Sequence, residues 1–119
     1  MTNIFVFGSN LAGRHGAGAA LTALRYYGAI YGQGEGLQGN SYGIPTKDKY
    51  IKTLPLTEIH LAVTRFLEFA AENQHLIFNV TKIGCGLAGY SPHQIAPFFR
   101  NHTENVLLPD EFRDLLNSK

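Results

Sequence analysis

The segment from Thr57 to Asn73 carries apolar residues with the period of an α-helix. Apolar side chains return every three or four residues, which gathers them on one stripe of a helix and leaves polar residues on the other side. Thr57 can cap this helix, and the carboxylate of Glu58 suits its first turn. We therefore predict the clearest helix of the chain here. The stripe consists of Ile59, Ala62, Val63, Phe66, Leu67 and Ala70.

Short runs of apolar residues predict buried strands at several other places. Residues 3–7, Leu76–Val80 and Asn105–Leu108 are rich in β-branched and aromatic residues. Tyr42–Thr46 predicts a further short strand, and Lys47–Tyr50 follows it as an exposed connection.

The remaining segments predict three more helices and one long loop. Ala17–Tyr27 favours a short helix that ends at Gly28, and Ser91–Gln94 has a capping-box pattern that begins a helix running to about residue 101. Pro109–Glu111 opens a last helix with acids in its first turn. Gly28–Gly43 is rich in glycine and is expected to be an extended surface loop. Strands that alternate with helices predict an α/β layered fold.

Composition narrows the class of protein. The 119 residues fit one domain, 1–119, and 45% hydrophobic with 16% charged residues is typical of a soluble globular protein. The net charge is +1 and the basic residues are scattered, which gives little electrostatic support for nucleic-acid binding. Cys85 is the one cysteine, so no intramolecular disulfide forms. Without a signal peptide or a membrane span in the sequence, we expect a cytoplasmic protein.

All thirteen glycines lie in two windows, Gly8–Gly43 and Gly84–Gly89. Each window opens after a strand-like run and leads into a predicted helix. Glycine-rich backbone at such a position can present amide groups to a phosphate. Each loop alone is compatible with a tight turn, but the two together favour a diphosphate ligand.

Familiar motifs do not explain these loops. The spacing of Gly8 and Gly13 matches a P-loop, yet Arg14 and His15 stand where lysine and Ser/Thr are needed, and no G-x-G-x-x-G is present. Cys85 lacks the arginine that a phosphatase loop needs six residues later, which favours a small residue in a tight turn. The five histidines have no metal-ligand spacing and are expected at the surface or in packing. We expect neither a metal nor a cofactor.

Two other side chains have alternative interpretations. Lys47 is either a solvated surface lysine or, if the turn at Pro45 directs it toward the ligand, a nucleophile or electrostatic catalyst. Tyr90, just past the second loop, either covers a ribose or base or belongs to the core.

Three motifs in this order resemble the macrodomain family, which binds or hydrolyses ADP-ribose. Phe7–Leu11 followed by Arg14–Leu21 is similar to the family's asparagine-bearing strand and glycine-rich loop. Ile44–Lys47 and Ile83–Leu87 resemble the lysine-dependent branch, which includes the terminal ADP-ribose glycohydrolase and an antitoxin that removes ADP-ribose from DNA. The resemblance spans roughly residues 4–108 and extends to phage-encoded macrodomain-like proteins, for which the location would be the host cytoplasm.

This resemblance implies a compact three-layer fold with a mixed central sheet flanked by helices, and it implies a role for each matching residue. Asn10 would hydrogen-bond the distal ribose, Tyr90 would pack on that ribose, and Lys47 would act on the anomeric carbon. The two loops would hold the diphosphate. The ligand-binding residues implied are Gly8, Ser9, Gly16, Ala17, Gly18, Gly84, Cys85, Gly86, Leu87 and Tyr90.

The sequence also departs from the family. Ala88 stands where the protein-directed glycohydrolase has an acid, which the DNA-directed relative also lacks. No residue takes the position of the aspartate that reads adenine, and Gly28–Gly43 is expected to form a wall over the base. The resemblance implies hydrolysis of an ADP-ribosyl linkage on DNA or protein. The alternatives are a non-catalytic reader or sequesterer of ADP-ribose or NAD-derived nucleotides, an ADP-ribose 1″-phosphate phosphatase, and a structural protein in which the loops are only turns.

Overall fold

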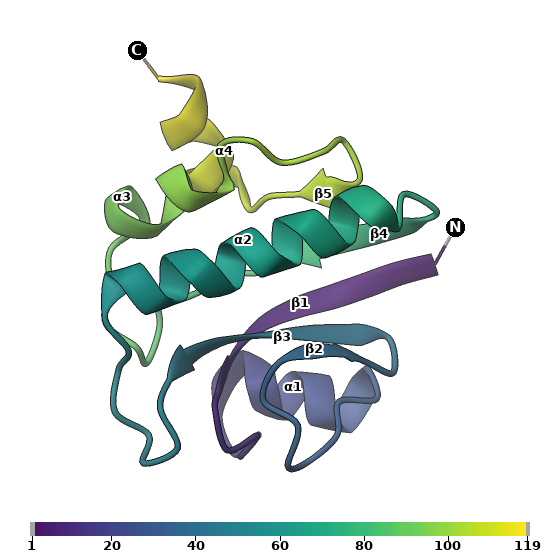
Figure 1. Ribbon diagram of the computed structural model, residues 1–119, viewed down its shortest axis with the longest axis vertical. Coiled ribbons are helices and arrows are strands. Elements are labelled where there is room, and N and C mark those ends of the chain that lie inside the picture. Colours follow the sequence, from purple (N-terminus) through teal and green to yellow (C-terminus); the bar gives the residue numbers. More distant parts are fainter. Residues whose placement is uncertain (1, 119) are drawn as a thin grey trace.

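A computed structural model describes residues 2–118 as an α/β fold in which helices flank a mixed five-stranded sheet (Figure 1). The strands and helices alternate along most of the chain, as the hydrophobic pattern predicts. Among the described residues, no helix is long and apolar enough to cross a membrane. The elements are β1 (Thr2–Asn10), α1 (Gly18–Tyr26), β2 (Gly36–Gln38), β3 (Ser41–Lys47), α2 (Leu56–Glu72), β4 (Leu76–Val80), α3 (Pro92–Ile95), the 3-10 helix η1 (Ala96–Phe99), β5 (Val106–Leu107) and α4 (Asp110–Asn117).

The sheet has the strand order β2-β3-β1-β4-β5, with β1 at its centre. β1 runs parallel to both β3 and β4, and β5 runs parallel to β4, whereas β2 pairs antiparallel with β3. Parallel strands end at the same edge of a sheet, so the segments that follow β1, β3 and β4 emerge together. Ligands of open α/β sheets bind at this edge.

The alternation of side chains along β1 divides the interior into two parts. Ile4 and Val6 point into a large cluster that includes residues of α2, α3 and α4, whereas Phe7 belongs to a smaller cluster with Ala20 and Ala23 of α1. α1 therefore covers one face of the sheet and α2 the other, which is visible in Figure 1.

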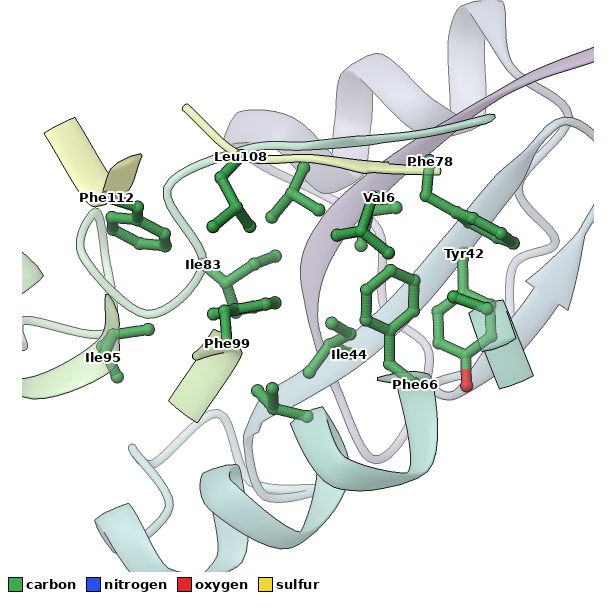
Figure 2. Packing of buried hydrophobic residues seen from close by; sticks show 14 of the residues in the cluster. Val6, Tyr42, Ile44, Phe66, Phe78, Ile83, Ile95, Phe99, Leu108 and Phe112 are labelled. Carbon is green, nitrogen blue, oxygen red and sulfur yellow. The ribbon is translucent and has the colours of Figure 1, made fainter. Parts of the chain in front are cut away.

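Aromatic side chains form the centre of the large cluster (Figure 2). The ring of Phe66 meets the rings of Tyr42 and Phe78 edge-on, at centroid distances of 5.0 and 5.3 Å, and Phe99 lies beyond it at 6.4 Å. Burial and the nearby charge of Glu35 raise the pKa of Tyr42 to about 12, so its hydroxyl stays neutral. These contacts join α2 to both β3 and β4.

The structure corrects the prediction of an extended loop over Gly28–Gly43. This segment contains β2, and Gln38 is only 2% exposed. Arg65 of α2 pairs with Glu35 at 2.7 Å, from Nε to Oε2, which ties the segment to the helix. Apolar periodicity could not reveal β2, because a buried glutamine takes the place of a hydrophobic residue in it.

The predicted helix from Ser91 to about residue 101 is shorter and divided. The backbone N–H of Ser91 donates to Gln94 Oε1 at 2.9 Å, as the capping pattern predicts. The α-helix ends at Ile95 and continues as the 3-10 helix η1, which contains Pro97. Proline has no N–H for a regular helical hydrogen bond, which accounts for the change.

Replacing Phe66 tests whether α2 is held by this aromatic packing. Phe66 is 0% exposed, so Phe66→Ala is expected to lower the free energy of unfolding by about 3–5 kcal/mol. Leu61→Ala is the control in the same helix, because Leu61 is 53% exposed and its truncation should cost less than about 1 kcal/mol. Urea unfolding measures both values, and equal losses would contradict the assignment.

Candidate functional site

A cavity of about 570 Å³ lies where the segments after β1, β3 and β4 meet. Both glycine loops line it, from opposite ends of the sequence. All of the predicted site residues except Cys85 and Tyr90 contribute to its wall. The predicted residues that line it are Gly8, Ser9, Asn10, Gly16, Ala17, Gly18, Lys47, Gly84, Gly86 and Leu87.

The pairing of β1 with β3 places Asn10 directly opposite Lys47. The strand register shifts between Ser9 and Asn10, and the N–H of Leu11 donates to the carbonyl of Lys47 at 2.9 Å. Two residues that lie far apart in the sequence thus become neighbours at the edge of the cavity.

The side chain of Asn10 also closes the first turn of the glycine loop. Its Oδ1 accepts from the N–H of Arg14 at 2.9 Å, and its Nδ2 donates to the carbonyl of Arg14 at 2.8 Å. An amide has a second N–H and a second lone pair. Asn10 can therefore hold the loop and still offer a hydrogen bond to a ligand.

The two glycine loops lie close together in the cavity wall. A Cβ on Gly8 would lie 3.8 Å from the backbone nitrogen of Gly84, and one on Gly18 would lie 3.8 Å from Leu87 Cδ1. Gly8 belongs to β1 and Gly18 begins α1, so the segments that flank the first glycine loop come within contact distance of the second loop.

Gly16 and Gly86 differ from the glycines that the fold requires. A Cβ on Gly39 would come within 2.6 Å of the carbonyl oxygen of Gly28, so that position has no room for a side chain. A Cβ on Gly16 or Gly86 meets no atom within 4 Å, and neither residue has a positive φ. Neither packing nor backbone conformation requires glycine at these two positions of the cavity wall.

The charged side chains in the cavity wall are all cationic. Arg14, Lys47 and Lys82 line the cavity, and none of the aspartates or glutamates within residues 2–118 does. Lys82 forms an ion pair with Glu111, with 3.3 Å between Nζ and Oε1. The cavity therefore favours an anionic ligand even though the net charge of the chain is only +1.

Cys85 and Tyr90 lie behind the cavity wall. Cys85 is half-buried against the large core cluster, with its Sγ 3.4 Å from the carbonyl oxygen of Ile83, and burial raises the pKa of its thiol. Tyr90 packs against the same cluster, and its hydroxyl donates to the carbonyl of Leu54 at 2.8 Å. Neither side chain lines the cavity. Of the two interpretations of Tyr90, the structure shows the one in which its side chain packs against the core.

Tyr31 joins the cavity wall from the segment that precedes β2, and sequence reasoning did not single it out. The segment is held from within by Gln38, whose Oε1 accepts from the N–H of Ile30 at 2.8 Å and from His15 Nε2 at 3.1 Å. His15 is fully buried, with its ring edge-on to Phe7. The packing role expected for the histidines thus applies to His15.

Ile51 also lines the cavity, and its backbone conformation is unusual. It has a φ of 66°, in the left-handed region that β-branched residues rarely adopt. Asp48 fixes this turn, because its Oδ1 accepts from the N–H groups of Tyr50 at 2.8 Å and Lys52 at 3.0 Å. No sequence pattern marks such a residue, since isoleucine is not expected in this conformation.

Comparison of the chain with models of protein families, with curated proteins and with solved structures finds no match. Within residues 2–118, no three His, Cys, Asp or Glu side chains form a group that could hold a metal ion. The chemistry of the site must therefore be argued from its own residues.

Replacing Ile51 tests the strain in this turn. Ile51→Gly is expected to raise the free energy of unfolding by up to about 1 kcal/mol, because glycine adopts a positive φ without the clash of a Cβ. Ile51→Val is the control, since valine keeps the β-branch and should give no gain. Thermal unfolding of both variants measures the change in stability. A glycine variant that is less stable than the wild type would show that the side-chain contacts of Ile51 outweigh the backbone strain.

Proposed function

We propose that the cavity binds the diphosphate of ADP-ribose or of a related nucleotide. The observation that carries this proposal is the pair of cavity glycines, Gly16 and Gly86, which the fold itself does not require. Side chains there would extend into the open space at the cavity wall and screen the backbone amides. Their absence leaves the main chain of both loops open to an anion, in a cavity whose charged side chains are cationic.

The position of Asn10 supports a sugar next to the diphosphate. It lies beside the loops at the end of β1, with hydrogen-bonding capacity left over from its contacts with Arg14. Ribose hydroxyls both donate and accept, so an amide suits them. The resemblance of this strand and loop to those of macrodomains supports the same ligand and a macrodomain-like form of the fold.

We further propose that the protein hydrolyses an ADP-ribosyl linkage, with Lys47 acting at the anomeric carbon. In this reaction the bond between that carbon and the linked group breaks, water supplies the hydroxyl of the released ADP-ribose, and the linked group leaves with a proton. If the lysine amine attacks the carbon first, water then breaks the bond between the lysine and that carbon. Lys47 is paired with Asn10 in the sheet and both residues line the cavity, so the lysine amine and the amide proposed to bind the ribose can reach the same ligand. The amine acts either as a nucleophile or as a fixed positive charge.

A non-catalytic reader of ADP-ribose is the second candidate, and one observation favours it. Among the described residues that line the cavity there is no aspartate or glutamate, and His15 is buried behind the wall. Hydrolysis would therefore proceed without a side-chain carboxylate to activate water, and all of the assistance would fall on Lys47. Both candidates bind ADP-ribose, so only a measurement of hydrolysis distinguishes them.

Substitutions at Gly86 test the diphosphate site. Gly86→Ala has room for its methyl group and should fold normally, whereas Gly86→Glu adds a carboxylate that repels and blocks the ligand. With ADP-ribose at 100 times its Kd, the wild type should gain about 2.7 kcal/mol, seen as a rise in melting temperature, and the glutamate variant should gain nothing. Cys85→Ala should bind ADP-ribose like the wild type, because the Cys85 thiol packs against the core and does not line the cavity. A rise that survives in Gly86→Glu, or none in the wild type, would refute the site.

Substitutions at Lys47 test catalysis separately from binding. Lys47→Ala should still give a melting shift with ADP-ribose but should lose release of ADP-ribose from a modified DNA or protein, measured by chromatography. Lys47→Arg keeps the charge, so activity in this variant indicates electrostatic catalysis and its loss indicates a nucleophile. Activity that persists in Lys47→Ala would exclude the mechanism in which the lysine is catalytic.

Two other outcomes would identify a different function. A wild type that binds ADP-ribose tightly but releases none from the modified DNA or protein would be a non-catalytic reader. A wild type that releases phosphate from ADP-ribose 1″-phosphate would be a phosphatase.

A further inference from the structure

The connection between β3 and α2 concentrates positive charge next to the cavity. We call residues 47–53 the β3–α2 hairpin, since Lys47 and Thr53 form an antiparallel bridge. It contains three lysines and one aspartate, although the whole chain has a net charge of only +1. Lys49 and Lys52 are exposed, and neither forms an ion pair within the described part of the chain. The hairpin projects from the sheet at the lower left of Figure 1.

The single acidic side chain of the hairpin, that of Asp48, forms hydrogen bonds with the backbone of the turn. Asp48 Oδ1 accepts from two main-chain N–H groups, and the N–H of Asp48 donates to the carbonyl of Lys52 at 2.7 Å. This aspartate shapes the turn and does not pair with a lysine. Hydrogen bonds therefore hold the turn, and Asp48 leaves Lys49 and Lys52 without an ion pair in the part of the chain that the structure describes.

An exposed aromatic ring lies between the two free lysines. Tyr50 is 70% exposed, and Lys49 Nζ lies 5.3 Å from the centre of its ring. A tyrosine this exposed contributes little to the stability of the fold. An exposed ring beside cations is the arrangement that binds single-stranded nucleic acids, in which phosphates meet the charges and an unpaired base stacks on the ring.

The hairpin is also fixed against the cavity. Lys47 and Ile51 both line the cavity, and Thr53 Oγ1 donates to the carbonyl of Ala88 in the second glycine loop at 2.9 Å. Lys49, Tyr50 and Lys52 are chain neighbours of Lys47 and Ile51, so a strand bound to them lies next to the cavity.

We propose that the β3–α2 hairpin docks a single-stranded nucleic acid, so that a nucleotide carrying the ADP-ribosyl group enters the cavity. The proposal rests on the proposed function for what the cavity holds, but the docking surface is argued from the hairpin alone. An acidic peptide would satisfy the lysines and would leave the exposed ring of Tyr50 without a partner. Nucleic acid satisfies both.

Binding of a fluorescent single-stranded DNA oligonucleotide, followed by anisotropy at several salt concentrations, tests the proposal. The double variant Lys49→Gln/Lys52→Gln should bind several-fold more weakly, and the slope of log K against log salt should shrink by about 0.7 for each lysine removed. Tyr50→Ala should weaken binding by about fivefold to a hundredfold with an unchanged slope. Arg25→Gln/Arg100→Gln is the control, with the same loss of charge at exposed residues outside the cavity wall.

Three results would overturn the proposal. They are a wild type that does not bind the oligonucleotide at low salt, a hairpin variant that binds like the arginine control, and a polyglutamate peptide that binds as tightly as the DNA. The melting shift with free ADP-ribose is measured on the same variants and should not change. If ADP-ribose gives no shift in the wild type while DNA binding depends on the hairpin, the docking surface stands and the proposed cavity ligand is wrong.

Discussion

The parallel pairing of the central strand β1 with β3 on one side and β4 on the other is the constraint on which the rest of the structure depends. It brings three segments to one edge of the sheet, two of them the glycine loops and the third the β3–α2 hairpin. It also places Asn10 against Lys47. If β1 paired differently, every residue of the cavity would remain in the sequence but the cavity would not exist.

Much of this arrangement could be predicted because it follows from side-chain periodicity. The stripe of α2 and the short apolar runs of β1, β3 and β4 each bury hydrophobic surface, and burial is what these patterns record. β2 could not be found in this way. It is held by the buried hydrogen bond between Gln38 and His15 and by the pair of Arg65 with Glu35. Hydrogen bonds between distant residues leave no local pattern.

The main chain of the candidate site could be predicted better than its side chains. Clustered glycines mark both loops, so the positions of the loops could be inferred from the sequence. The sequence does not separate a glycine that the fold needs, such as Gly39, from one that it does not, such as Gly86. The orientations of Cys85 and Tyr90, both turned toward the core, also depend on packing. The same holds for charge, because a near-neutral total conceals the local excess in the hairpin.

In the proposed function, the main chain and the side chains of the site have different tasks. Backbone amides can bind a diphosphate without any particular side chain, so mere binding would place few demands on the residues around the loops. A lysine fixed opposite Asn10, beside a turn that holds Ile51 at an unfavourable φ, is more than binding requires. Strained residues persist where the surrounding structure holds them in place, and they concentrate at functional sites. The strain at Ile51 therefore marks the edge of the sheet next to Lys47 as a place where function beyond binding is expected, which agrees with the proposed role of Lys47.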